Sequence, residues 1–502
     1  MGPGRRALLG GLLGGLSLAL MLVLGALGES AAVPGLGPRT AGPPWDLAAG
    51  ASSATVTVIG ILATLLGAGA VWQGLHAVRD ASLPTRVPRL LLAAGIGAAL
   101  LLTLVPPVGS ADHLSYAAYG RIAAAGDDPY AVAPIDWRGG TDPVAGAVQP
   151  PWQATPSVYG PLATLAFGVA ARLGDGSLRA TVWCWSLICA LAFVAVAVLL
   201  DRVHRGDGAA RARAMVLWTL NPLLLGQLVL GAHVDVLATA PAVAALVIAA
   251  RWPAPAGMLL GAAVAIKAPY ALFGLAALWG VRGLARDQRW RAVANGLFGA
   301  VVVLVPAHAW AGPHVIDQLR TASGFTSIAS PWRAVVNGVE WALGEPGAMR
   351  PVVVPLALVA AAGLAWALSH RVSSHRVLPP PTRGAGPEAA AAAVVLCAAW
   401  VLCAPYTLPW YDAMVWAPLA LLPARGQLAR LETVLLVRLC VLAVAYLPGR
   451  VVGMSEQVAT LTLGFRRYLA PALVLVTVLV ALRWGLSGRG DPAGPRPRQP
   501  AR

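Results

Sequence analysis

The run ADHLSYAAYGR, residues 111–121, places a carboxylate and two phenols at helical spacing. On a helix, Asp112, Tyr116 and Tyr119 share one face, because side chains three, four and seven positions apart lie above one another. A carboxylate with two phenols on one face predicts a polar site beside a groove. The plainer alternative is that Asp112 caps the helix and the tyrosines belong to an aromatic belt at a membrane boundary.

A second polar group interrupts an apolar stretch: Asn221-Pro222 is followed by Gly231-Ala232-His233-Val234-Asp235. Ionisable side chains inside a membrane are costly and by default indicate a functional site. Because His233 and Asp235 are two positions apart, they cannot share a helix face. We therefore expect them in a break between helices that opens toward the outer face, with a simple polar hairpin turn as the alternative.

Lys267, in the run Lys267-Ala268-Pro269-Tyr270, is the only lysine in the chain and lies within an apolar segment. A lysine in such a place needs an anionic partner or enough freedom to reach the interface. A phosphate group suits it, because an ammonium binds phosphate as a compact point charge. Snorkelling to the interface is the alternative.

Aromatic residues gather in residues 405–412, PYTLPWYD, which include Trp410 and Tyr411. Three aromatics and two prolines predict an outer loop between two helices. The loop could form a wall that stacks on a sugar or holds a lipid, or it could be an aromatic anchor. Arg438, within a later apolar segment, is a charge without an obvious partner in the sequence.

Two shorter motifs lie between these groups. Residues 126–130, GDDPY, predict a turn whose paired carboxylates could bind a divalent cation, although such acidic pairs are more often simply solvated. Tyr159 precedes Gly160 and Pro161, and Pro161 is well placed to begin the next helix. An interfacial tyrosine at a helix entry would be sufficient to explain this second motif.

The elements that carry these residues are predicted to be membrane helices. The chain has 502 residues, of which 58% are hydrophobic and 12% charged, against about 25% charged in soluble domains. Apolar runs of bilayer length recur from end to end. The sequence therefore predicts an all-α, polytopic integral membrane protein of about 12–14 transmembrane helices. Residues 1–485 would form one membrane domain, and residues 486–502 a disordered cytoplasmic tail.

The net charge of +16 does not indicate nucleic-acid binding. The arginines cluster in short loops between apolar runs, as the positive-inside rule requires, and no basic face carries interleaved aromatics. This rule places the loops at 28–53 and 108–157 outside.

One basic loop conflicts with this simple topology. The loop at 202–213 has four arginines and should be inside, yet it lies outside if every preceding segment crosses. We prefer an arrangement in which 158–173 does not cross and 256–281 is broken at Lys267 and Pro269. The alternative lets all segments cross.

The order of the motifs resembles that of the GT-C superfamily of polyprenol-phosphate-sugar-dependent glycosyltransferases. More narrowly, residues 88–420 resemble the actinobacterial polyprenol-phosphomannose-dependent α-1,6-mannosyltransferases of lipomannan and lipoarabinomannan synthesis. The resemblance implies a multi-pass protein of the bacterial plasma membrane whose active site faces the outside. It also implies a polyprenyl-phosphate mannose donor and a lipoglycan acceptor. It implies no cofactor and no divalent metal. Other members often have this large loop after their first membrane helix, whereas three apolar segments precede it here.

The resemblance also implies roles for single residues. The family's catalytic carboxylate lies in the first large outer loop, which matches Asp112. Asp112 would take the proton of the acceptor hydroxyl, and positive charge would stabilise the departing phosphate. Lys267 is the main candidate for that charge, with Arg121 and His233 as further ones.

The remaining candidates would shape the substrate pocket. These substrate-binding residues are Tyr116, Tyr119, Tyr159, Asp235, Trp410 and Tyr411. Two other functions stay open at this point: a transporter or flippase of polyprenyl-linked sugars, and the same enzyme class acting on arabinose or glucose.

Overall fold

The computed structural model describes residues 1–80, 87–345, 347, 349–373, 385–423, 426–449 and 452–487. Across these residues the regular structure is helical throughout, and no strand forms. The helices of the first half are α1 (Pro3–Ala26), α2 (Ser53–Asp80), α3 (Val87–Leu102), α4 (Asp112–Ala124), α5 (Pro161–Leu173), α6 (Leu178–Val203), α7 (Gly208–Ala214), α8 (Pro222–Leu224), α9 (Asp235–Ile248) and α10 (Pro253–Ile266).

The second half contributes ten more α-helices. They are α11 (Ala271–Gly280), α12 (Arg286–Ala311), α13 (His314–Ser323), α14 (Pro331–Leu343), α15 (Arg350–Val372), α16 (Ala385–Cys403), α17 (Ala413–Leu421), α18 (Ala429–Ala445), α19 (Glu456–Gly464) and α20 (Ala470–Ser487). Short 3-10 helices are η1 (Trp137–Gly140), η2 (Ala145–Ala147), η5 (Ala268–Tyr270), η6 (Val281–Gly283) and η8 (Pro409–Asp412). Segments η3 (Met215–Thr219), η4 (Leu225–Leu230) and η9 (Phe465–Leu469) are π-helical.

Eight helical segments of the described residues are long and apolar enough to cross a membrane. They are Pro3–Ala26, Ser53–Arg79, Leu178–Val203, Gly208–Leu230, Arg286–Ala311, Pro351–Val372, Gly386–Cys403 and Glu456–Ser487. Four shorter apolar helices are α3, α5, α9 and α10. The prediction of an all-α, polytopic membrane protein is therefore confirmed, and three helices do precede the large loop.

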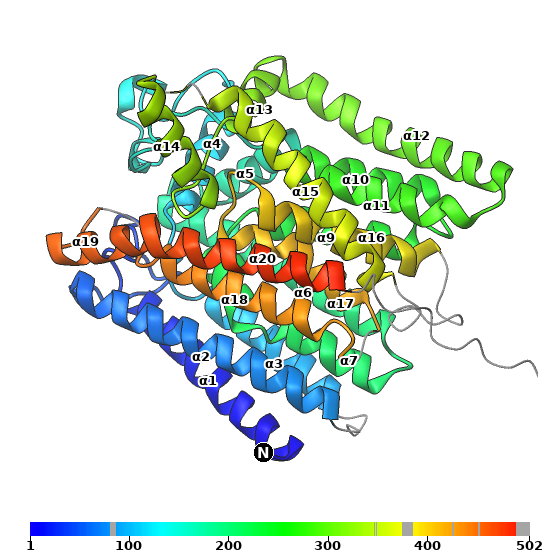
Figure 1. Cartoon of the computed structure of the whole chain (residues 1–502). Helices are drawn as coiled ribbons and strands as arrows, with labels where there is room; N and C mark the ends of the chain where they lie inside the picture. The colour runs from blue at the N-terminus through cyan, green and yellow to red at the C-terminus, as the bar shows by residue number, and fades with distance from the viewer. Residues whose placement is uncertain are drawn as a thin grey trace, which may run out of the picture.

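Burial separates lipid-facing helices from the interior of the bundle. Helix α12 runs along one edge (Figure 1) and exposes large apolar side chains such as Phe298 and Trp310, as a lipid-facing helix would. Helix α17 is buried over its whole length, from Ala413 to Leu421. The interior therefore packs helix on helix and leaves α12 for the bilayer.

The loop elements gather at one end of the bundle. Helices α4, α13 and α14 lie together there, while α7, which carries part of the basic 202–213 segment, lies at the opposite end (Figure 1). This matches the arrangement we preferred for the 202–213 loop. Which end faces the outside of the cell stays a prediction.

The segment just after helix α5 lies beside the loop between α1 and α2. Shortly after α5, Arg179 donates hydrogen bonds to the carbonyls of Pro38 and Pro44 in the loop between α1 and α2. In the same loop, the Ala32 carbonyl accepts a hydrogen bond from the N–H of Gly109, which lies just before α4. The segment after α5 thus lies beside the segment before α4, and α6 runs from there toward α7. That the 158–173 segment does not cross the membrane stays a prediction.

The 256–281 segment is broken, as predicted. Helix α10 ends at Ile266, Lys267 has an extended backbone, and α11 begins only at Ala271. Pro269 lacks the N–H that a continuous helix would need at this point. Most of the predicted tail at 486–502 lies outside the described residues, since α20 ends at Ser487.

Candidate active site

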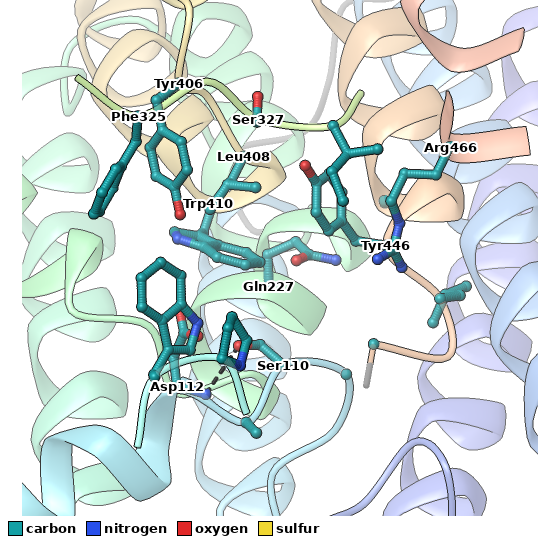
Figure 2. Close-up of a pocket in the computed structure, with 18 of the residues that line it drawn as sticks. Ser110, Asp112, Gln227, Phe325, Ser327, Tyr406, Leu408, Trp410, Tyr446 and Arg466 are labelled. Atoms are coloured by element: carbon teal, nitrogen blue, oxygen red, sulfur yellow. Dashed lines mark hydrogen bonds between the residues drawn. The ribbon is translucent and has the colours of Figure 1, made fainter. Parts of the chain in front are cut away.

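Two cavities meet at Asp112. The large cavity has a volume of about 1060 Å³ and the small cavity about 250 Å³, and Asp112 lines both. Their shared wall also contains five other large side chains: Trp152, Phe325, Tyr406, Leu408 and Trp410. Figure 2 shows Asp112 and Ser110 on one side of the large cavity and Tyr446 and Arg466 on the other. The carboxylate thus stands where ligands in the two cavities would meet.

Asp112 is the first residue of α4, and its backbone N–H donates to the Ser110 hydroxyl at 2.9 Å. Its side chain is 17% exposed. Burial raises the pKa of the Asp112 carboxyl to about 6, although the hydrogen bond with Ser110 and the positive charge of Lys267 oppose that shift. A carboxylate with a raised pKa is a better proton acceptor than an ordinary aspartate.

His233 faces Asp112 from the turn between η4 and α9. Its Nδ1 lies 2.6 Å from the Gln227 carbonyl oxygen, so Nδ1 carries the proton and donates it. Its Nε2 lies 3.8 Å from Asp112 Oδ2, too far for a hydrogen bond, and has no partner among the described residues. Two acceptor atoms therefore face one gap, which suits a ligand with two hydroxyl groups that donate one hydrogen bond to each.

The turn at His233 is held in place on both sides. Ala232 has a positive φ of 52°, and its carbonyl accepts the Trp185 indole N–H at 2.7 Å. The imidazole of His233 stacks on Trp410 with 3.6 Å between the ring centroids. The predicted break between helices is thus confirmed, and it brings residues of two distant motifs into contact.

Lys267 and Asp235 form an ion pair at the small cavity, with 2.7 Å between Nζ and Oδ1. Side-chain exposure is 11% for Lys267 and 2% for Asp235, so neither charge is free in solvent. The ammonium also lies 3.6 Å from the ring centroid of Tyr411. The lysine has three N–H donors, and this pair uses one of them, which leaves others for a ligand.

The Tyr159-Gly160-Pro161 motif joins α5 to the end of α10. The Gly160 N–H donates to the Ile266 carbonyl at 3.1 Å, and a Cβ on Gly160 would lie 2.2 Å from the Ala265 oxygen. Only glycine permits this approach, because any side chain would overlap backbone. The motif thereby fixes Tyr159, which lines the small cavity, next to the residue that precedes Lys267.

The two tyrosines of α4 have different surroundings. Tyr119 lines the small cavity, and its hydroxyl donates to the Thr155 carbonyl at 2.9 Å. Tyr116 lines neither cavity and packs on Phe167, with ring centroids 4.8 Å apart. It also contacts Tyr159 edge to face. Tyr116 therefore positions Tyr159 and α4, and its role in substrate binding stays a prediction.

Arg121 was expected near the departing phosphate, and the structure contradicts this. Its Nε lies 3.3 Å from Asp142 Oδ2, and it lines neither cavity. Arg121 is nine positions after Asp112, which on a helix means about 13 Å along the axis and the opposite face. The helix that presents Asp112 to the cavities therefore turns Arg121 away from them.

Arg438 does have a partner. Both Arg438 and Asp412 are completely buried and form an ion pair, and Arg438 Nη2 also donates to Thr407 Oγ1 at 2.6 Å. Asp412 belongs to the same PYTLPWYD run as Trp410 and Tyr411. The ion pair connects α18 to η8. It thereby supports Trp410 and Tyr411 of η8, which form the aromatic wall of the small cavity.

The two carboxylates of the GDDPY turn have separate protein partners. Asp127 Oδ2 accepts the Trp137 indole N–H at 2.8 Å. Asp128 Oδ2 lies 2.8 Å from His314 Nδ1, and its Oδ1 accepts the Tyr130 N–H. These contacts hold the large loop and α13 together. Each of the three carboxylate oxygens named above therefore has a protein partner.

Several cavity residues were not singled out from the sequence. Arg333, Tyr446 and Arg466 line the large cavity, as do Trp152 and Phe325. Arg466 is followed by Arg467 and Tyr468, a run that is typical of a membrane boundary. Nothing in its spacing distinguishes a buried arginine from an exposed one.

Comparisons with known proteins identify the family of the chain. The family model described as "Alpha-(1->6)-mannopyranosyltransferase, N-terminal domain" matches residues 11–283. The chain is 30% identical over 233 residues to a probable alpha-(1->6)-mannopyranosyltransferase of Mycolicibacterium smegmatis, covering 46% of this chain and 38% of that protein. It is 28% identical over 227 residues to alpha-(1->6)-mannopyranosyltransferase B of Corynebacterium glutamicum, covering 43% and 36%. It is 32% identical over 209 residues to alpha-(1->6)-mannopyranosyltransferase A of Mycobacterium tuberculosis, covering 41% and 39%.

The fold and the paired cavities define a polytopic membrane protein with a buried polar site. The chain belongs to the alpha-(1->6)-mannopyranosyltransferase family, and its matched residues, 11–283, include Asp112, His233, Asp235 and Lys267. The match with each of these relatives spans less than two fifths of the relative's length. No solved structure matches the chain.

Proposed function

We propose that the protein is a membrane mannosyltransferase that moves mannose from a polyprenyl-phosphate donor to an α-1,6-mannan of a lipoglycan. The observation that carries this proposal is the position of Asp112, a single carboxylate at the junction of two cavities. A transferase needs room for a donor and an acceptor, and a base between them. The names of the relatives supply the sugar and the linkage.

In this proposal the reaction is one displacement at the anomeric carbon. An acceptor hydroxyl attacks that carbon, the bond from carbon to the phosphate oxygen breaks, and the phosphate leaves with the electron pair. Asp112 takes the proton of the attacking hydroxyl. A polyprenyl phosphate leaves as a stabilised anion, so the leaving group needs no general acid. Inversion at a β-linked mannosyl phosphate gives an α-linked product.

The small cavity suits the sugar end of the donor. Its polar wall contains Lys267, Tyr119 and Tyr159 beside Asp112. Lys267 would donate to the leaving phosphate with the N–H groups that Asp235 does not use. Trp410 and Tyr411 offer ring faces to the sugar, and His233 Nε2 would accept from a hydroxyl next to the one that reaches Asp112.

The acceptor would enter through the large cavity. Reaction on the outer face of the plasma membrane, at the end of the bundle where α4, α13 and α14 gather, is part of the proposal. The proposal includes no divalent metal, and the acidic pair of the GDDPY turn, Asp127 and Asp128, is engaged by Trp137 and His314.

A transporter is the second candidate function, because Lys267, Asp235 and Arg438 lie in apolar stretches. The ion pairs of Lys267 with Asp235 and of Arg438 with Asp412 account for these charges without a transported ion.

Product analysis separates the two classes. Purified protein in lipid nanodiscs is incubated with polyprenyl-phosphate mannose and a short synthetic α-1,6-mannoside, and the products are analysed by mass spectrometry. A product one hexose heavier, with an α-1,6 linkage by digestion with linkage-specific mannosidases, supports the proposal. Intact donor, or donor moved between leaflets without a new bond, contradicts it. Competition with arabinose-bearing and glucose-bearing donors tests the sugar.

A further inference from the structure

Arg466 is a buried cation that the proposed reaction does not use. It lies on η9, is 5% exposed and lines the large cavity (Figure 2). Its Nε donates to the Ala445 carbonyl at 2.6 Å, and its guanidinium lies 4.7 Å from the ring centroid of Tyr446. Its Nη2 has no hydrogen-bond partner among the described residues.

A second arginine approaches from another element. Arg333, at the start of α14, is half-buried and lines the same cavity, and its Nε also lacks a partner in the described part of the chain. The segment just before it packs against η9, since Ala329 shares a cluster with Ala445, Tyr446 and Phe465.

Neither arginine has a carboxylate partner in the described residues. Two acids line the large cavity there: Asp112 on the opposite side, and Glu340, whose Oε1 accepts the Gly347 N–H. A buried guanidinium without an anion is costly. An anion that enters the cavity would relieve that cost.

The walls of the large cavity narrow the class of anion. Apolar side chains line it from several helices, including Met21, Leu24, Val353 and Val354. A guanidinium fork matches two oxygens of a phosphate group, and apolar walls accept an alkyl chain. The combination fits an amphiphile that carries a phosphate.

We infer that Arg466 and Arg333 form a binding site for the phosphate group of a lipid-linked substrate, separate from Lys267 and on the far side of the large cavity from Asp112. In a transferase with two lipid-linked substrates, one would present its sugar at Asp112 and Lys267, and the other would be held through its anchor phosphate at Arg466. The inference deepens the proposed function, but its test is a binding measurement that needs no turnover.

The probe is radiolabelled dodecyl phosphate, titrated onto the full-length protein in phosphatidylcholine nanodiscs in a scintillation proximity assay. Because Lys267 is the proposed site of the donor phosphate, the arginine variants are also made in the Lys267→Met background. There we expect saturable binding that Arg466→Gln weakens by at least about tenfold and Arg333→Gln by several-fold. Arg467→Gln is the matched control, because Arg467 is the next residue on the same π-helical turn and is exposed. Its affinity should stay within about twofold of the unmodified protein.

Competing ligands identify the source of the phosphate. Unlabelled dodecyl phosphate should displace the probe at far lower concentration than inorganic phosphate, and dodecanol should not displace it. Equal competition by inorganic phosphate would overturn the assignment to a lipid. Loss of binding in Lys267→Met with full binding in Arg466→Gln would overturn the assignment to Arg466.

Two further variants keep the test independent of folding and of catalysis. Arg466→Lys retains the charge and should bind better than Arg466→Gln, and equal binding by these two variants contradicts the site. Asp112→Asn should bind the probe normally, so the binding site can stand even if the assigned catalytic role of Asp112 fails.

Discussion

The Nε2 atom of His233 lies 3.8 Å from the Oδ2 atom of Asp112 across a gap, and Nε2 has no hydrogen-bond partner among the described residues. Asp112 starts a helix in the large loop, and His233 lies in a turn between two buried helices. A sugar placed in this gap could donate one hydroxyl to His233 Nε2 and present a neighbouring hydroxyl to Asp112, which would take its proton. The pair therefore orients the attacking group.

Activity should fall on the acid side of neutrality. Burial raises the pKa of Asp112 to about 6, and only the ionised carboxylate can accept a proton. The fraction in the base form is therefore nearly complete at pH 7.5 and about half at pH 6. We expect kcat/KM to decrease roughly tenfold per pH unit well below pH 6. A flat profile between pH 5 and 7.5 is inconsistent with Asp112 as the base.

Removing one charge of the Lys267–Asp235 pair should destabilise the protein more than removing both charges. Asp235→Asn leaves a buried ammonium without its carboxylate, and removing one partner of a buried pair typically costs about 3–5 kcal/mol. We expect a lower unfolding temperature for Asp235→Asn and a smaller effect for the double variant Asp235→Asn/Lys267→Met. Thermal unfolding in detergent measures both. If the two variants have equal stability, the charges are not coupled.

Arg438 and Asp412 should behave as a purely structural pair. Both are fully buried, and Arg438→Met leaves Asp412 uncompensated beneath the aromatic wall. The expected cost is again about 3–5 kcal/mol. The combined variant Arg438→Met/Asp412→Leu should recover part of this stability. Thermal unfolding provides the comparison, and a single variant as stable as the unmodified protein would refute this role.

Gly160→Ala should be more harmful than a matched change on the same helix. Its added Cβ would meet the Ala265 oxygen at 2.2 Å, and overpacking of this kind typically costs about 1–3 kcal/mol. It would also move the backbone next to Lys267, so we expect a higher KM for the donor. Gly168→Ala is the control, because a Cβ there would have its nearest neighbour at an ordinary 3.9 Å. Equal KM values in the two variants would exclude a positioning role for Gly160.

The sequence predicted the membrane fold and most of the small cavity. Apolar runs specify helices in a bilayer directly, and interrupted runs marked the breaks at His233 and Lys267. Each motif around Asp112, Tyr159, Lys267 and Trp410 was also compatible with a structural role. Their order along the chain indicated the glycosyltransferase family. Their contacts with one another, such as the stacking of His233 on Trp410, depend on tertiary packing.

The parts that sequence reasoning missed depend on burial and on partners. Arg121 and Arg466 are both arginines near aromatic residues, yet one pairs with Asp142 and the other faces a cavity. Asp412 and Arg438 occupy different helical segments, and nothing in their spacing predicted an ion pair. For each of these residues, the surroundings that decide its role come from distant segments of the chain.

The most direct test of the account is the initial rate of mannose transfer by Asp112→Asn, measured with saturating donor and acceptor at pH 7.5. A general base contributes about 10²–10⁴-fold, so we expect kcat to fall by at least about 100-fold. Folding raises the Asp112 pKa, so the ionised carboxylate lowers stability above pH 6, and Asp112→Asn should unfold at an equal or higher temperature. A folded Asp112→Asn variant with near-normal kcat would contradict the role of Asp112 on which the account depends.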